Sequence, residues 1–151
     1  QEEEVITSVI VTLQSADNTV TLSSVDLDGD GPNEPVLSVQ GLLNANATYT
    51  GSVRFLNESV APLEDITEEV KEEAEEHQVF YSFTAPINSV TTSDNDSNGN
   101  PLGLDFTLTT GAAGTAGFGI TLRHEPKKPN TGILDAGGET DVAVNFTISV
   151  E

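Results

Sequence analysis

The chain contains no cysteine and no methionine, and only five of its 151 residues are lysine or arginine. The absence of cysteine excludes a disulfide framework, a thiolate metal site and a cysteine nucleophile. The lack of both sulfur-containing residues argues against copper(I), which prefers thiolate and thioether ligands. No apolar run approaches the roughly 20 residues of a membrane-spanning helix. We therefore expect contact with a membrane only through a lipid anchor that this chain lacks.

Acidic residues dominate the charge, since 25 of them against five basic residues give a net charge of −20. Such a charge repels phosphate backbones and anionic lipids, which argues against nucleic acid as a partner. It attracts cations, and bound cations would relieve the self-repulsion of the folded chain. The start, Gln1 to Glu4, is not of signal-peptide type, so we expect any export signal or anchor to lie upstream.

Motifs of catalysis are missing from the sequence. No glycine-rich phosphate loop follows a strand pattern, and no serine sits in a nucleophile elbow. Carboxylates are abundant, but none is singled out as a general acid paired with a base. We therefore predict a binding protein that works outside the cytoplasm, and no enzyme.

The length fits one domain, which we predict to span residues 1–151. Runs of Val, Ile, Leu, Thr and Phe alternate with polar residues and are separated by Gly, Asn, Asp and Pro, which is typical of antiparallel strands. The clearest alternation runs from Val142 to Val150 and leaves Asp141 on the opposite, outward face. The pattern predicts an all-β domain, an antiparallel two-sheet β-sandwich of immunoglobulin-like architecture with about nine strands.

One segment, Glu64 to His77, has helical periodicity instead. Ile66, Val70, Ala74 and His77 form one stripe of a helix, and Asp65 stands where a capping residue is expected. The other positions are mostly glutamate, so the sequence predicts one short acidic helix whose exposed face is either solvated or screened by cations.

A calcium loop is one candidate site. Asp26, Asp28 and Asp30 alternate and end in a glycine, and Glu34 stands at the ninth position of the loop. The twelfth position is Leu37, where an EF-hand has a glutamate. The alternative is a hairpin loop in which Asp and Gly supply turn geometry only.

The two histidines define a second candidate site. His77 opens a strand pattern in phase with Val79, and His124 closes another in phase with Leu122, so both imidazoles fall on the core-facing side at a strand end. If the two strands are neighbours, the histidines converge. Glutamates flank both histidines; we predict that Glu73, Glu76 and Glu125 complete a zinc or copper(II) site. The alternative is two unrelated histidines with local hydrogen bonds.

Five segments taken together resemble a family of small outer-membrane lipoproteins of Bacteroidota: DLDGDG, NATYTGSVRFLNES, EDITEEVKEEAEEHQVFY, LRHEPKKPN and AGGETDVAVNFTISV. Members are often labelled as having a type 1 periplasmic-binding fold and tend to be encoded near TonB-dependent receptors. The resemblance implies a cell-surface protein that serves nutrient uptake. Its fold label conflicts with the strand pattern, because a type 1 periplasmic-binding fold needs alternating βαβ units over a longer chain.

Two functions remain open on these grounds. The first is an accessory outer-membrane lipoprotein that binds zinc or copper through the histidine site and serves a TonB-dependent receptor. The second is a structural or adhesive β-sandwich of a surface assembly, in which calcium rigidifies the Asp26–Asp30 loop.

Overall fold

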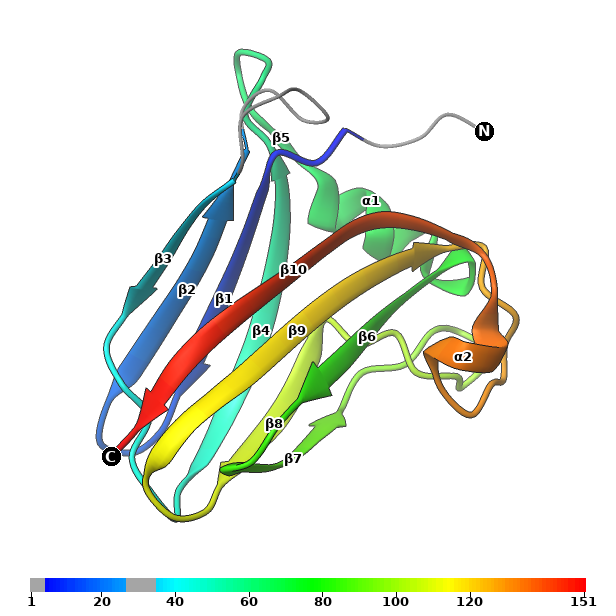
Figure 1. Ribbon diagram of the computed structural model, residues 1–151. Coiled ribbons are helices and arrows are strands. Elements are labelled where there is room, and N and C mark those ends of the chain that lie inside the picture. Colours follow the sequence, from blue (N-terminus) through cyan, green and yellow to red (C-terminus); the bar gives the residue numbers. More distant parts are fainter. Residues whose placement is uncertain (1–4, 27–34) are drawn as a thin grey trace.

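The structure is a computed structural model that describes residues 5–26 and 35–151. Two antiparallel sheets face each other across one core (Figure 1). The larger has the strand order β3-β2-β1-β4-β8-β7, with β5 beside β4, and the smaller has the order β10-β9-β6. Ten strands lie in the described part: β1 Ser8–Gln14, β2 Thr19–Val25, β3 Val36–Gln40, β4 Thr48–Asn57, β5 Glu64–Asp65, β6 His77–Phe83, β7 Ile87–Thr92, β8 Asp105–Thr110, β9 Gly114–His124 and β10 Glu139–Val150.

The larger sheet contains a Greek key. Strands β1, β2 and β3 pair in chain order, and β4 returns to lie beside β1, which gives the spatial order 4-1-2-3. The buried Val11 lies opposite Leu22 on one side and Val53 on the other. Because these apolar side chains share one face in register, that face packs against the smaller sheet while the opposite face stays polar.

The core lies between the sheets and carries most of the aromatic rings. Tyr81, Phe106 and Phe118 form a cluster with ring centroids 4.6 to 5.9 Å apart. The Phe106 ring occupies the space beside Gly51, where a Cβ atom would lie 2.3 Å from it. A side chain at Gly51 would therefore displace the ring, which explains a glycine in the middle of β4.

The predicted acidic helix is present but shorter than expected. Helix α1 spans Ile66–Glu72, a 3₁₀ turn (η1) spans Ala74–Glu76, and the Asp65 side chain accepts a hydrogen bond from the Thr67 amide as the helix cap. All four stripe residues are buried. The helix gives way to the 3₁₀ turn because His77 already pairs with β9 as the first residue of β6.

The structure confirms the all-β class and the two antiparallel sheets, and it does not confirm the immunoglobulin-like architecture. The described residues hold ten strands where about nine were predicted, because the two-residue β5 pairs with the end of β4. A further short helix, α2 (Ile133–Ala136), lies between β9 and β10, whereas only one helix was predicted in the whole domain. No helix among the described residues is long and apolar enough to cross a membrane.

Candidate metal centre

The two histidines meet at one end of the smaller sheet. His77 is the first residue of β6, His124 is the last residue of β9, and the antiparallel register places them directly opposite each other. Their rings are stacked, with centroids 4.9 Å apart and an angle of 6° between the planes. The predicted strand phase of the two histidines is confirmed. The two strands are also neighbours, which was the condition for the histidines to converge.

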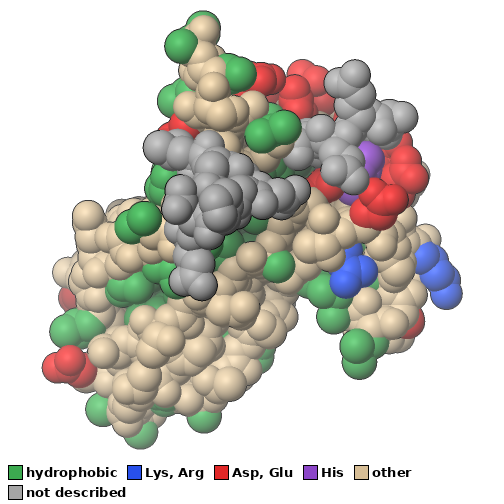
Figure 2. All heavy atoms as spheres, turned by 45° about the horizontal axis from the view of Figure 1, so that its top comes forward, with side chains coloured by type: hydrophobic (Ala, Val, Ile, Leu, Met, Phe, Trp, Pro, Cys, Tyr) green, Lys and Arg blue, Asp and Glu red, His purple; other side chains and the backbone are tan. Residues whose placement is uncertain are grey.

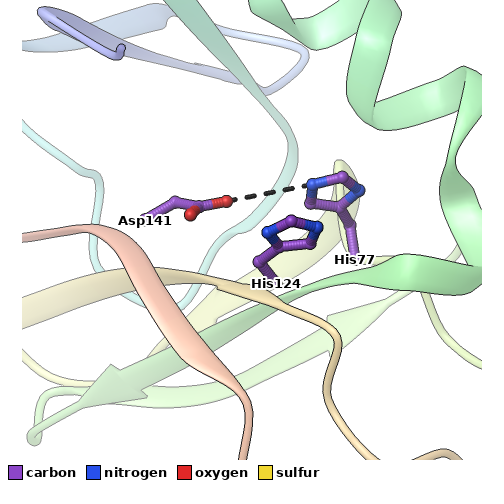
Figure 3. A group of neighbouring side chains, drawn as sticks. All are labelled: His77, His124 and Asp141. Atoms are coloured by element: carbon purple, nitrogen blue, oxygen red, sulfur yellow. Dashed lines mark ion pairs between the residues drawn. The ribbon is translucent and has the colours of Figure 1, made fainter. Parts of the chain in front are cut away.

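The His77 ring is fully buried and has a defined orientation. Its Nδ1 lies 3.0 Å from the backbone carbonyl oxygen of Glu73. A carbonyl oxygen only accepts hydrogen bonds, so Nδ1 carries the proton and donates. In the neutral ring the lone pair is then on Nε2, which lies 3.8 Å from Oδ2 of Asp141 (Figure 3). A second bond that fixes the tautomer in this way is the usual support of a metal-binding histidine.

Asp141 belongs to the site, although the alternation of its strand predicted that it faces outward. The pairing of β10 with β9 is regular up to Thr140 and resumes at Val142, so Asp141 is an extra residue at a bulge. A bulge breaks the two-residue alternation and re-aims the side chain. The Asp141 side chain therefore points inward toward the histidines and is only 3% exposed. The strand pattern alone carries no signal for this bulge.

His124 has a looser environment than His77. The residue is 6% exposed, and its Nε2 has no hydrogen-bond partner in the part of the chain that the structure describes. Oε1 of Glu125 lies 4.0 Å from this atom. Among the described residues, the His124 ring thus lacks a hydrogen bond of the kind that orients the His77 ring.

Two groups of potential metal ligands share His124. In the inner group, one ligand atom each of His77, His124 and Asp141 lie within 4.8 Å of one another. In the outer group, the same holds for Glu76, His124 and Glu125. The predicted ligands Glu76 and Glu125 thus join one histidine, not both. The Glu73 carboxylate belongs to neither group, and Glu73 contributes its carbonyl oxygen to His77 instead.

The backbone around the outer group is tightly constrained. The Glu125 amide donates to the Glu76 carbonyl oxygen at 2.6 Å, and Glu125 itself has a positive φ of 55°. Gly138 packs against this turn so closely that a Cβ atom would lie 2.5 Å from the His124 carbonyl oxygen, and its φ is +79°. A non-glycine residue with positive φ is uncommon and is retained where the surroundings determine it.

The parallel rings bear on how one ion would bind. The nitrogen lone pair lies in the plane of its imidazole ring, so an ion bound by two rings must lie in or near both planes. Stacked parallel planes do not meet at such a point. One ring must therefore turn when the ion binds, and the hydrogen bond from His77 Nδ1 to the Glu73 carbonyl oxygen opposes a turn of His77.

Most of the calcium candidate falls outside the described residues. Asp28, Asp30 and Glu34 lie in the segment 27–34, which the structure does not describe. Asp26 directly follows β2, and its amide donates to the Thr7 carbonyl oxygen at 2.7 Å. The calcium hypothesis therefore stays a prediction from sequence.

No model of a known protein family matches the chain, and no curated protein and no solved structure matches it significantly. The resemblance to the Bacteroidota lipoproteins consequently stays a prediction.

Proposed function

We propose that the chain is a non-enzymatic binding module that takes up one divalent transition-metal ion at His77, His124 and Asp141. The observation that carries the proposal is the burial of two imidazoles and one carboxylate within 4.8 Å of one another at a strand end. Two imidazole nitrogens and one carboxylate oxygen this close together form a ligand set that divalent transition metals take in proteins.

The ligand chemistry favours zinc or copper(II). Imidazole nitrogen and carboxylate oxygen suit both ions, whereas calcium and magnesium take oxygen ligands almost only. Three protein ligands leave one position of a tetrahedral zinc ion for water or for a group of a partner. The chain's net charge of −20 raises the local concentration of cations at its surface.

The cellular setting is part of the proposal and is supported by the five segments that resemble outer-membrane lipoproteins. On this basis the chain acts at the cell surface, held by a lipid anchor, and presents metal to a TonB-dependent receptor. We also propose the immunoglobulin-like description of the sandwich, which the Greek key in the larger sheet supports.

The test is titration of the chelator-stripped protein with zinc, copper(II) and calcium by calorimetry, together with elemental analysis of the protein purified without chelator. We expect one zinc or copper ion per chain. At a free concentration of 100 times Kd the ion should add about 2.7 kcal/mol to the free energy of unfolding. Absence of transition-metal binding would refute the proposal, and calcium binding alone would support a calcium-stabilised structural module in its place.

Asp141→Asn tests the ligand that the bulge provides. An amide is a weaker ligand than a carboxylate, so we expect zinc affinity to fall about 100-fold, which is roughly 3 kcal/mol. The matched control is Glu139→Gln, which removes the same charge from an exposed position two residues earlier on β10. The control should retain zinc affinity within about threefold. If the two substitutions change the calorimetric Kd for zinc equally, Asp141 is not a ligand of the ion.

A further inference from the structure

The outer group stands at the protein surface beside the buried inner group. Glu125 is 64% exposed at its side chain, while His77 is fully buried. In Figure 2, acidic side chains gather around the histidine atoms that reach this face. The outer group therefore lies nearer to solvent than the His77 side of the inner group.

His124 connects the two groups, since it belongs to both. It is more than nine-tenths buried, its Nε2 has no hydrogen-bond partner among the described residues, and this atom lies 4.0 Å from the Glu125 carboxylate. A buried ring nitrogen in this position is an independent sign of a ligand at the outer group, beyond the acidic residues themselves. The parallel stacking with His77 also requires a ring to turn before both histidines hold one ion.

We propose that Glu76, His124 and Glu125 form an outer entry site, where a divalent transition-metal ion is first held, and that His124 then turns to pass the ion to His77 and Asp141. This inference rests on the proposed function, because it requires the inner site. The chemistry of the two groups fits the order of events. Two carboxylates and one imidazole exchange their ion faster than a buried site with two imidazoles, and the exposed carboxylates can replace the hydration shell stepwise.

An entry site on the path lowers the barrier for binding and for release alike. Its removal therefore slows both rates by the same factor and leaves the equilibrium constant unchanged. This separates an entry site from a ligand of the final site, whose removal lowers affinity, and from general attraction of cations by the acidic surface, which any two glutamates nearby would supply.

The experiment measures zinc association and release by stopped flow with a fluorescent zinc indicator. For Glu76→Gln with Glu125→Gln we expect both rates to fall about tenfold, with Kd unchanged within about threefold. The matched control is Glu68→Gln with Glu72→Gln, two exposed glutamates of α1, which removes the same charge from the same acidic region. The control should change the rates by about twofold or less.

If the variant with Glu76→Gln and Glu125→Gln takes up and releases zinc as fast as the control variant, the proposal of an entry site is wrong. Loss of equilibrium affinity in the Glu76 and Glu125 variant would also overturn it, because these carboxylates would then hold the final ion. Failure of the unsubstituted protein to bind zinc at all would instead refute the proposed function, and the titration described above reads that outcome independently of the rates.

Discussion

Replacement of His77 and His124 together by alanine is expected to lower zinc affinity by at least about 10⁴-fold. Structural zinc sites with four ligands bind with about 10–16 kcal/mol, so each ligand accounts for roughly 2.5 to 4 kcal/mol, and two account for roughly 5 to 8 kcal/mol. Competition with a chelator of known affinity measures Kd over this range. Zinc affinity within tenfold of the original would show that the ion binds elsewhere.

The double substitution also leaves a cavity, because His77 and His124 are both buried. The stability of each protein is therefore measured without metal first, and the increase in the unfolding free energy on adding zinc is compared within each variant. Tyr81→Phe is the control for a weakened sheet. Tyr81 lies on the same strand as His77, β6, and the substitution removes the hydroxyl that donates to the Gly103 carbonyl oxygen. For Tyr81→Phe, the increase in the unfolding free energy on adding zinc should be the same as for the original protein.

The convergence of the histidines could be predicted from sequence because it depends on strand phase. Both histidines follow the two-residue alternation of strong strands, and the pairing of β6 with β9 then brings them together. Asp141 follows the opposite phase, and only the bulge in β10 turns it inward. A bulge depends on how two distant strands fit, so the alternation within one strand cannot reveal it.

The polar segment from Ser93 to Pro101 is another part of the fold that the sequence pattern does not predict fully. Its composition predicts an exposed loop, and yet Asp96 is 7% exposed. The Asp96 carboxylate forms a buried ion pair with Lys128, whose Nζ lies 2.9 Å from Asp96 Oδ2. A buried lysine needs a counterion. The packing of two loops, whose paired residues are 32 positions apart in the chain, determines that Asp96 is this counterion.

Lys128→Met is expected to destabilise the protein by about 3 to 5 kcal/mol. The lysine and aspartate side chains are only 6% and 0% exposed, and Lys128 Nζ also donates to the Ala74 carbonyl oxygen at 2.9 Å. Removal of one member of a buried ion pair leaves the other charge buried without its counterion. For a chain of this size we expect the thermal midpoint to fall by about 10 °C or more, as followed by circular dichroism.

Lys127→Met is the matched control, since Lys127 is the exposed neighbour of Lys128. It should change the unfolding free energy by no more than about 0.5 kcal/mol. Combining Asp96→Asn with Lys128→Met should recover part of the loss, because the buried negative charge is then gone as well. A double variant as unstable as the sum of the single variants would mean that the two side chains do not act as a pair.

The loss in Lys128→Met should depend on pH. Burial raises the pKa of Asp96, but the hydrogen bonds from Lys128 and from the Asn100 and Asn98 amides, with the Lys128 charge, hold that pKa below its usual value. The pair therefore makes its full contribution to the free energy of unfolding above the pKa of an aspartate in the unfolded chain, about 3.9. This contribution disappears as the pH falls through the lower pKa of Asp96 in the folded protein. The difference between the original protein and Lys128→Met should be largest at neutral pH and shrink as the pH falls and the Asp96 carboxyl of the folded protein becomes protonated. A difference that is equally large at pH 3 would trace the loss to packing of the lysine stem instead of the ion pair.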